Sequence, residues 1–589
     1  NNKVTDAADA KLTSLRFSYF DTIFAYSRAS QTSKIGETGD RVFINSLSDI
    51  SFYPGEQIQL HYDMNPWYVE DKYELTYESS DPNIAEVDQN GVVKGLKEGT
   101  TIITLKVKGS RINASIIVNI NNPFIIENRT LVAYKGLGGE VVIPDDEGIL
   151  YIGSYAFCLY ETDRTIELTE DDYDANKIPA SNTSITSIII PEGVEEIQKY
   201  AFYNCSGLKS VTLPSTIKYV REYAFCKDVK LETINLEKVI VIGRQAFKEC
   251  VKLNNIDLTN IYAIGDDAFN GCKALEKVDL TTLRNTGKQA FKDCVNLSEV
   301  VLSENTKLSM AMFVNAGLTS VDIYEKVEIP AFCFAMCEKL EKVTINNDII
   351  NIGKGAFSDC SKLTSVIFNA RVDAIGEQAF YNSTALTKIV LPNNNVRIGN
   401  YCFYKCEQLT EIVFLENTFI SEVEGSVFQD TNVTTFTVDA NNSNYKSSGE
   451  LLLDATGKII IFAAPYKEYG DYYIDEKYEE ISDGAFTGTS ITSLTISNKN
   501  MVIGAFAFAN CELLGVVTLP IEGVSSIGKH AFNYASKLEK IENLDKVKIV
   551  ADYAFANTGL KQVVLADNAS YGEGAFYKSN LKEVTIGEN

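Results

Sequence analysis

Hydrophobic and polar residues follow one short pattern that returns along most of the chain. Residues 242–258 read IGRQAFKECVKLNNIDL, and residues 264–280 read IGDDAFNGCKALEKVDL. Both fit I-G-x-x-A-F-x-x-C-x-x-L-x-x-V/I-x-L, and a unit of this size repeated at a fixed spacing predicts a solenoid. Its phenylalanine marks 17 copies, mostly 21–25 residues apart. These are Phe157, Phe202, Phe225, Phe247, Phe269, Phe291, Phe313, Phe334, Phe357, Phe380, Phe403, Phe428, Phe486, Phe508, Phe532, Phe555 and Phe576.

Each unit predicts one coil with a single buried side. The segment L-x-x-V-x-L alternates apolar and polar residues, as at Leu208, Val211 and Leu213, which is typical of a short strand with one buried face. Glycine of the Ile-Gly pair is expected to give the backbone freedom for a corner. The small alanine permits close approach of coils, and the phenylalanine fills the interior. A coil of this size cannot bury its own apolar side, so stacked coils must share one core. The predicted repeat core includes Phe202, Phe225, Phe247, Phe269, Phe291, Phe357, Phe380, Phe403, Cys250, Cys272 and Cys294.

The first 121 residues lack this repeat. Residues 1–9 are expected to form a flexible tail, and 10–121 a β-sandwich, because short alternating runs are separated by turn signals such as Asn90-Gly91. The stretch YESSDPNIAEVDQNGVVKGLKEGTTIITLKV resembles the bacterial Ig-like domain of group 2. Tyr77 stands where that family usually has Trp, and residues 21–47 look like an insertion.

The remaining residues divide into an entry segment and the solenoid. Residues 122–151 are expected to supply strands that cap the first coil, because repeat arrays need a cap. Residues 152–589 form the predicted solenoid, interrupted at 439–480. There, Leu451–Leu453 and Ile459–Phe462 predict a hairpin leaving the coil, followed by a tyrosine-rich loop. The predicted fold class is mostly β: a leucine-rich repeat solenoid with a parallel sheet on one face and short turns or helical turns at Ala-Phe, preceded by an Ig-like β-sandwich.

The repeat resembles the Treponema-type leucine-rich repeat of BspA-like bacterial surface proteins. The resemblance covers residues 152–589 and depends on A-F-x-x-C; the asparagine ladder of other leucine-rich repeats is absent, since Thr216 and Ile261 take its place. It implies an exported, non-catalytic protein at the bacterial cell surface that adheres to host extracellular matrix proteins or to other bacteria. The chain starts at Asn1 without Met, so we expect that a signal or anchor segment lies outside it.

Net charge narrows the possible partners. The formal charge of −25 argues against nucleic acid, which needs a basic surface, and against anionic lipid. No run of 18 apolar residues is present, so no membrane span is predicted. With only His61 and His530, no catalytic triad, metal site or cofactor site is expected. The acidic runs at Asp145–Glu147 and Glu170–Asp172 are interpreted as solvated loops, with calcium binding left open.

The twelve cysteines are expected to be buried free thiols. Eight lie three residues after the repeat phenylalanine, where other copies have Ser, Thr or Ala. This choice of residues indicates a need for small volume. Disulfides between coils are disfavoured because the Cβ vectors would run parallel. One or two disulfides, or a metal or redox role, remain the alternatives.

Two surfaces are candidates for partner binding. The outward position of the strand is β-branched in three successive units, at Ile367, Val390 and Val413, and a contiguous apolar surface often marks an interface. Its alternative is plain β-propensity. The second candidate is the predicted loop with Tyr466, Tyr469, Tyr472 and Tyr473, which could instead pack on its own hairpin.

Three alternative functions are compatible with these sequence features. The favoured one is a cell-surface adhesion or interaction protein, expected to be a monomer, whose partners are a host matrix protein, a glycan or another cell. The alternatives are a structural or self-associating surface component and, less favoured, an extracellular glycan-processing enzyme that uses a carboxylate pair.

Overall fold

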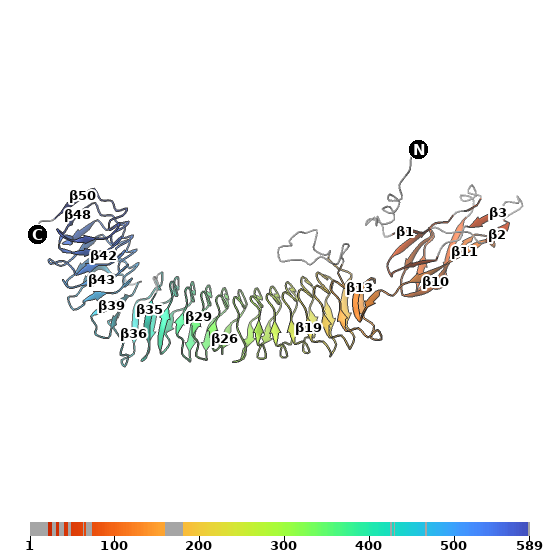
Figure 1. Cartoon of the computed structure of the whole chain (residues 1–589), viewed down its shortest axis with the longest axis horizontal. Coiled ribbons are helices and arrows are strands. Elements are labelled where there is room, and N and C mark those ends of the chain that lie inside the picture. Colours follow the sequence, from red (N-terminus) through yellow and green to blue (C-terminus); the bar gives the residue numbers. More distant parts are fainter. Residues whose placement is uncertain are drawn as a thin grey trace. The chain divides into compact units, whose positions relative to one another are not determined.

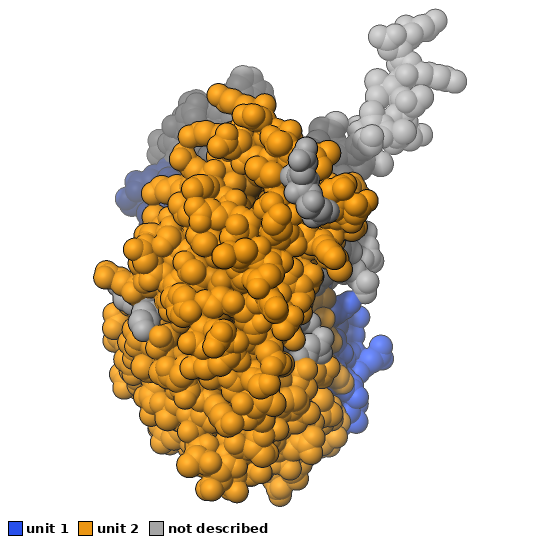
Figure 2. Space-filling view, turned by 90° about the vertical axis from the view of Figure 1, so that its left-hand side faces the viewer, with its two compact units in different colours: residues 1–208 blue, residues 209–589 orange. Residues whose placement is uncertain are grey.

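The fold is built from strands and turns. The computed structural model describes residues 22–25, 31–34, 41–44, 49–62, 64–65, 74–158, 181–423, 427–428, 430–465 and 468–586. Among these, the one helical element is a 3-10 turn, η2 (Leu544–Lys546). The chain divides into two compact units, residues 1–208 and 209–589, which are coloured separately in Figure 2. The prediction of a mostly β fold is confirmed.

Unit 1 begins with a β-sandwich. One sheet has the order β4 (Ile50–Phe52), β11 (Asn113–Ile120), β10 (Gly99–Val107) and β7 (Leu75–Ser79). The other has the order β1 (Thr22–Ala25), β5 (Gln57–Leu60), β9 (Val92–Gly95) and β8 (Ala85–Val87). A third sheet contains β2 (Gln31–Lys34), β3 (Arg41–Ile44) and β6 (Met64–Asn65), so two of its strands lie within the predicted insertion. Alternate residues such as Ile103, Ile116 and Val118 are buried in the core of the sandwich, as expected for sheets with one inward face.

Unit 1 then starts the solenoid with a hairpin. Strands β12 (Phe124–Glu127) and β13 (Thr130–Tyr134) are antiparallel, and β13 pairs in parallel with β15 (Tyr151–Ile152), which pairs with β17 (Glu196–Ile197). Strand β14 (Gly139–Val142) pairs in parallel with β16 (Ile185–Ile189). Two rows of parallel strands begin here, and the hairpin covers the first coil of one row.

Unit 2 contains two rows of parallel strands, with successive coils side by side (Figure 1). The first row contains β18 (Ser210–Thr212), β20 (Thr233–Ile234), β23 (Lys277–Asp279), β25 (Glu299–Val301), β26 (Ser320–Ile323), β28 (Lys342–Ile345), β30 (Ser365–Phe368), β32 (Lys388–Val390), β34 (Glu411–Phe414) and β36 (Thr435–Val438). The second row contains β19 (Tyr219–Val220), β21 (Val241–Ile242), β22 (Ala263–Ile264), β24 (Asn285–Thr286), β27 (Glu328–Ile329), β29 (Asn351–Ile352), β31 (Ala374–Ile375), β33 (Asn395–Ile398) and β35 (Phe419–Val423). Hydrogen-bonded pairing in the first row is broken between β20 and β23, β25 and β26, and β30 and β32.

The interruption at 439–480 is a second entry module. Strands β37 (Tyr445–Ser447), β38 (Leu451–Asp454) and β39 (Ile459–Ala463) are antiparallel, but β39 then pairs in parallel with β41 (Glu480–Ile481). Strand β40 (Gly470–Ile474) pairs in parallel with β42 (Ile491–Ile496), with a register shift at its first residue. The same succession, with the same shift, occurs at β12, β13 and β14. The predicted hairpin therefore forms, but it does not leave the coil: it restarts the solenoid.

The restarted array contains five further coils with their own core. One row continues with β43 (Val502–Ile503), β45 (Ser526–Ile527), β47 (Ile549–Val550) and β49 (Ser570–Tyr571). The other continues with β44 (Val516–Thr518), β46 (Lys540–Glu542), β48 (Gln562–Leu565) and β50 (Glu583–Ile586). Buried residues from Leu451 to Ala575 form one hydrophobic cluster, to which both the hairpin and the coils contribute.

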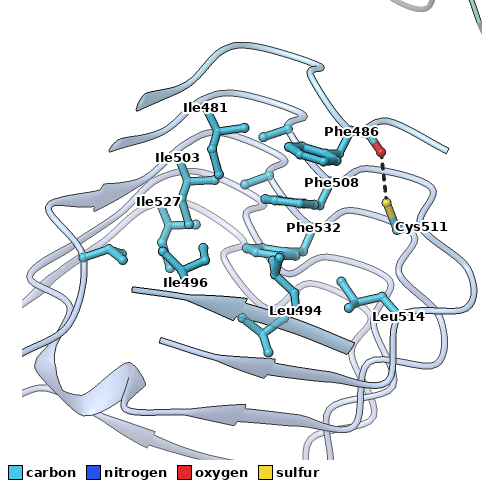
Figure 3. Close-up of a cluster of buried hydrophobic side chains, with 14 of the residues drawn as sticks. Ile481, Phe486, Leu494, Ile496, Ile503, Phe508, Cys511, Leu514, Ile527 and Phe532 are labelled. Atoms are coloured by element: carbon cyan, nitrogen blue, oxygen red, sulfur yellow. Dashed lines mark hydrogen bonds between the residues drawn. The ribbon is translucent and has the colours of Figure 1, made fainter. Parts of the chain in front are cut away.

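Repeat phenylalanines form the interior of each coil stack. From Phe225 to Phe428, successive rings in unit 2 lie 5.2–5.8 Å apart at interplanar angles of 2–12°. The second stack runs from Phe486 to Phe576 with centroid distances of 5.0–5.5 Å. Figure 3 shows its first three rings beside a parallel row of isoleucines. Parallel rings at this separation are offset, which is the favourable arrangement.

The Ala-Phe segment is a chain of turns with two left-handed residues per coil. Around Phe247, the amides of Ala246, Lys248 and Cys250 each donate to the carbonyl three residues back. The amides of Gln245, Phe247 and Glu249 donate instead to carbonyls of the next coil, each at 2.8 Å. Gln245 and Glu249 have positive φ, 52° and 63°, and other coils repeat this pattern. Of the short turns or helical turns expected here, the structure has short turns, which direct every second amide toward the next coil.

The glycine of the Ile-Gly pair is required for a different reason than the one expected. A Cβ at Gly287 would lie 2.1 Å from the backbone of Gly265 and Asp266 in the preceding coil, and one at Gly265 would lie 2.4 Å from Arg244. Neither glycine has positive φ. Contact between adjacent backbones, and not corner flexibility, therefore excludes a side chain at Gly265 and Gly287.

Candidate binding surfaces

The three β-branched residues of the predicted surface lie on the outer sheet face, but their side chains are only partly exposed. Val390 and Val413 are register partners on β32 and β34, whereas Ile367 on β30 pairs with Thr344 and has no ladder partner on β32. All three of these aliphatic side chains are half-buried. They lie in one row of the outer sheet face, but the break between β30 and β32 interrupts it. Their role in binding stays a prediction.

The tyrosine-rich segment is mostly part of the core. Tyr469 is 7% exposed, and its ring meets that of Tyr472 at 4.8 Å, which in turn meets Phe486 at 5.6 Å. Tyr472 and Tyr473 lie on strand β40, and of these two only Tyr473, at 59% exposure, is exposed. Tyr469 and Tyr472 therefore pack against the first coil, as in the alternative left open by the sequence, and a role of this segment in binding stays a prediction. Tyr466 lies outside the described residues.

The cysteine position has a function that small volume does not explain. Cys250, Cys272 and Cys294 each direct their thiol to the phenylalanine carbonyl of the preceding coil, at 3.1–3.2 Å. Ser383 does the same at 3.2 Å, and Figure 3 shows the contact from Cys511 to Phe486. A small hydrogen-bond donor is therefore favoured here, although Ala also occurs. All twelve cysteines are free.

Threonine at this position indicates a second kind of corner. Thr431, Thr489 and Thr558 donate to the phenylalanine carbonyl of their own coil instead. In these coils the segment from phenylalanine to the inward strand residue is one residue shorter: Phe555 to Val563 spans eight positions, and Phe291 to Val300 spans nine. T-x-V, T-x-I or T-x-L in place of C-x-x-L is a sequence signal that the expectation of small volume overlooked.

Burial holds the thiols in their protonated form. Burial raises the pKa of the Cys250 and Cys272 thiols well above the usual range, and it raises that of Cys406 to about 12 and that of Cys511 to about 11. A thiolate is the form that attacks substrates and binds metals. Within the described residues, no group of three or more His, Cys, Asp or Glu side chains could hold a metal ion.

Exposed carboxylates are stabilised in their charged form. Hydrogen bonds from the Thr259 hydroxyl and amide lower the pKa of Asp257, and those from Thr437 and Lys388 lower the pKa of Glu411. Burial lowers the pKa of His530, whose ring is stacked between Phe506 and Tyr553 at 4.8 and 5.2 Å. These are properties of a charged, solvated surface. The acidic run Asp145–Glu147 is exposed, and Glu170–Asp172 lies outside the described residues.

Solved structures of other proteins match this chain at low identity. They include a leucine rich cell surface protein from Faecalibacterium prausnitzii (19% identity, 79% of this chain and 93% of that chain, TM-score 0.30), a leucine-rich repeat protein from Bacteroides ovatus (18%, 78% and 88%, 0.25) and the pneumococcal vaccine antigen PcpA (17%, 84% and 81%, 0.26). Curated protein sequences contain no match. None of the helical segments described here is long and apolar enough to cross a membrane.

Family models assign both parts of the chain. The model of the bacterial Ig-like domain (group 2) matches residues 49–115. The model of the BspA type leucine-rich repeat region matches residues 138–240, 176–280, 227–329, 327–448 and 479–589, which together span more than half of the chain. The chain therefore belongs to the BspA type leucine-rich repeat family and carries a bacterial Ig-like domain ahead of the repeats.

Proposed function

We propose that this protein is a non-catalytic interaction protein of the bacterial cell surface. Its solenoid binds host matrix proteins, glycans or other cells, and the Ig-like domain acts as a spacer. The observation that carries the proposal is the outer face of the first strand row in unit 2, which a continuous ladder of buried phenylalanines holds rigid. Repeat surfaces of this kind bind through many shallow contacts along the stack.

The chemistry of the surface supports binding and not turnover. A glycosidase needs one carboxyl group with a raised pKa as general acid. The shifts resolved for carboxyl groups in the described residues are all downward, as at Asp257 and Glu411. Buried, protonated thiols such as Cys250 are unsuited to nucleophilic attack. Both features favour a protein that presents charges over one that transfers protons.

A binding screen tests the proposal. The labelled full chain would be applied to immobilised matrix proteins, a glycan array and intact cells. We expect saturable binding to at least one of them, weakened by Val390→Lys and Val413→Lys together, because both side chains share one outer row. The matched control is Thr495→Lys with Thr518→Lys, register partners on the outer face of the second array.

Two outcomes would contradict the proposal. Hydrolysis of a glycan by the purified chain would favour an enzyme. Concentration-dependent assembly seen by light scattering, without binding to any probe, would favour a structural, self-associating surface component.

A further inference from the structure

A groove of about 550 Å³ lies on the outer sheet face between β25 and β26. It is an open hollow with Val300 and Leu302 in its floor and Glu299, Ser320, Asp322 and Tyr324 among its walls. All of these residues belong to unit 2 and to two successive coils. The groove interrupts a sheet that is otherwise continuous on either side of it, from β23 to β25 and from β26 to β30.

The groove opens where the hydrogen-bond ladder is missing. Strand β25 pairs with β23 through three residues and β26 with β28 through four, but β25 and β26 belong to separate sheets. Thr319 still donates to the Ser298 carbonyl, at 3.3 Å from its amide. The coil that contains β26 has the short corner: Phe313 to Val321 spans eight positions, against nine for Phe291 to Val300. The two strands thus lie side by side at their start, at Thr319 and Ser298, without forming a hydrogen-bonded ladder.

The floor of the groove is an apolar surface. The equivalent residues of neighbouring coils are more deeply buried. Val300 occupies the inward row, in which its neighbours Val278 and Val321 are 1% and 2% exposed. Val300 itself is only half-buried. Leu302 is 8% exposed, whereas the equivalent Leu280 is 1% exposed. Water thus reaches aliphatic carbon in this coil, and a ligand with an apolar stem would cover it.

The walls carry two carboxylates that are free to accept a new partner. Asp257 and Asp279, in the same outward row as Asp322, each accept from the amide and hydroxyl of a threonine two residues on. Tyr324 follows Asp322 at that spacing, and within the described residues no hydrogen bond or ion pair engages the Asp322 carboxylate. Among the described residues Glu299 forms one ion pair, with Lys277, and both side chains are more than half exposed. Exposed pairs of this kind are weak and exchange readily.

We propose that this groove binds an arginine or lysine side chain from an extended basic segment of a protein partner. The aliphatic stem covers Val300 and Leu302, the cationic head reaches Asp322 and Glu299, and the Tyr324 ring offers its face to the cation. The net charge of −25 attracts a basic partner. This assignment depends on the proposed interaction function and names the chemistry of one partner.

A peptide titration tests the groove. The probe is a fluorescein-labelled peptide of alternating arginine and serine, and its counterpart has glutamine in place of arginine. Fluorescence anisotropy would be measured with the full chain at about 0.15 M salt, where distant charges are screened. We expect binding of the arginine peptide alone. Glu299→Gln with Asp322→Asn should weaken it by about tenfold or more, the equivalent of about 1.4 kcal/mol.

A matched pair of substitutions separates this site from the overall negative charge. Glu232→Gln with Asp257→Asn also removes one exposed, lysine-paired glutamate and one outward aspartate. We expect it to change the affinity by less than about twofold, because only bulk charge is lost. An equal loss in both double variants would overturn the proposal. Circular dichroism melting would show that both variants remain folded.

Hydrogen exchange locates the bound peptide. We expect slower amide exchange at residues 298–302 and 319–324 when the arginine peptide is added. Absence of protection there would overturn the proposal, as would protection by an uncharged oligosaccharide in the absence of peptide binding, since that would make the groove a glycan site. Failure of the peptide while the full chain still binds cells or matrix proteins would refute this groove alone and leave the proposed function standing.

Discussion

Each coil is stabilised by a small set of side chains with separate tasks. In mid-array, Phe291 contributes ring contacts to the coils before and after it, at 5.3 and 5.6 Å. Cys294 ties the same coil to the carbonyl of Phe269 at 3.2 Å. Ala290 and Gly287 leave room for the adjacent backbones. Packing, hydrogen bonding and close approach are therefore assigned to different positions of one short motif.

Loss of a phenylalanine ring in the middle of the array should lower the stability strongly. Phe291 is fully buried, so Phe291→Ala should lower the free energy of unfolding by about 3–5 kcal/mol, through lost transfer energy and a cavity. Urea unfolding followed by circular dichroism measures this. The matched control is Phe332→Ala, because that ring is 38% exposed and should cost much less. A loss below about 1 kcal/mol at Phe291 would contradict the ring ladder.

Buried thiols should make stability fall at alkaline pH. Burial raises the pKa of Cys511 from 9.0 to about 11, so above pH 9 the unfolded chain releases a proton that the folded chain retains. Stability from this group is complete below pH 9 and is lost as pH rises to about 11. The expected slope is about 1.4 kcal/mol per pH unit.

A serine substitution isolates that thiol. Cys511→Ser keeps a hydroxyl donor, as Ser383 does in another coil, but has no group that titrates in this range. Urea unfolding at pH 8, 9.5 and 10.5 should give a shallower decline for the variant than for the unsubstituted chain. Identical declines would show that the thiol is accessible to water in the folded state.

At the scale of elements, the hairpin of β38 and β39 caps a new array. It supplies Leu451, Leu453 and Ile460 to the core that Phe486 and Phe508 continue. Its parallel contact with β41 gives the first coil a hydrogen-bonded neighbour. An uncapped coil would expose this apolar side to water, which repeat arrays avoid with terminal caps.

The capped array should fold alone. A fragment of residues 440–589 contains both the hairpin and the five coils, so we expect a cooperative thermal transition and a β-type circular dichroism spectrum. A fragment of residues 476–589 lacks β37 to β40 and is the control. We expect it to aggregate or remain unfolded because the core face of its first coil is exposed. Equal stability of the two fragments would contradict the capping role.

At the scale of the whole molecule, two arrays with separate ring stacks should respond locally to damage. Coils contact only their neighbours, so stability in repeat arrays is a sum of local terms. Phe508→Ala should therefore accelerate amide exchange in residues 481–586 by many fold and leave residues 209–400 nearly unchanged. Hydrogen exchange followed by mass spectrometry measures both regions at once. Uniform acceleration would indicate that unit 2 unfolds as one cooperative body.

Much of this fold was readable from the sequence because the repeat acts locally. The period, the inward phenylalanines and the free cysteines depend on contacts between residues about one coil apart, and the family match follows from the same motif. The strands β10 and β11 likewise follow from alternation and turn residues. Apolar side chains at regular spacing leave few ways to hide their surface from water.

Only the tertiary structure decided which residues of similar sequence context are buried and which are exposed. Tyr469 and Tyr473 look alike in sequence, but Tyr469 is buried against Tyr472 and Phe486, whereas Tyr473 on β40 is exposed. The groove beside Asp322 lies where β25 and β26 form no hydrogen-bonded ladder, an arrangement that involves two coils together. The repeat itself was determined by local hydrophobic periodicity. The exposure of the candidate binding surfaces was decided by strand pairing, since a ladder formed or missing between coils sets which side chains water can reach.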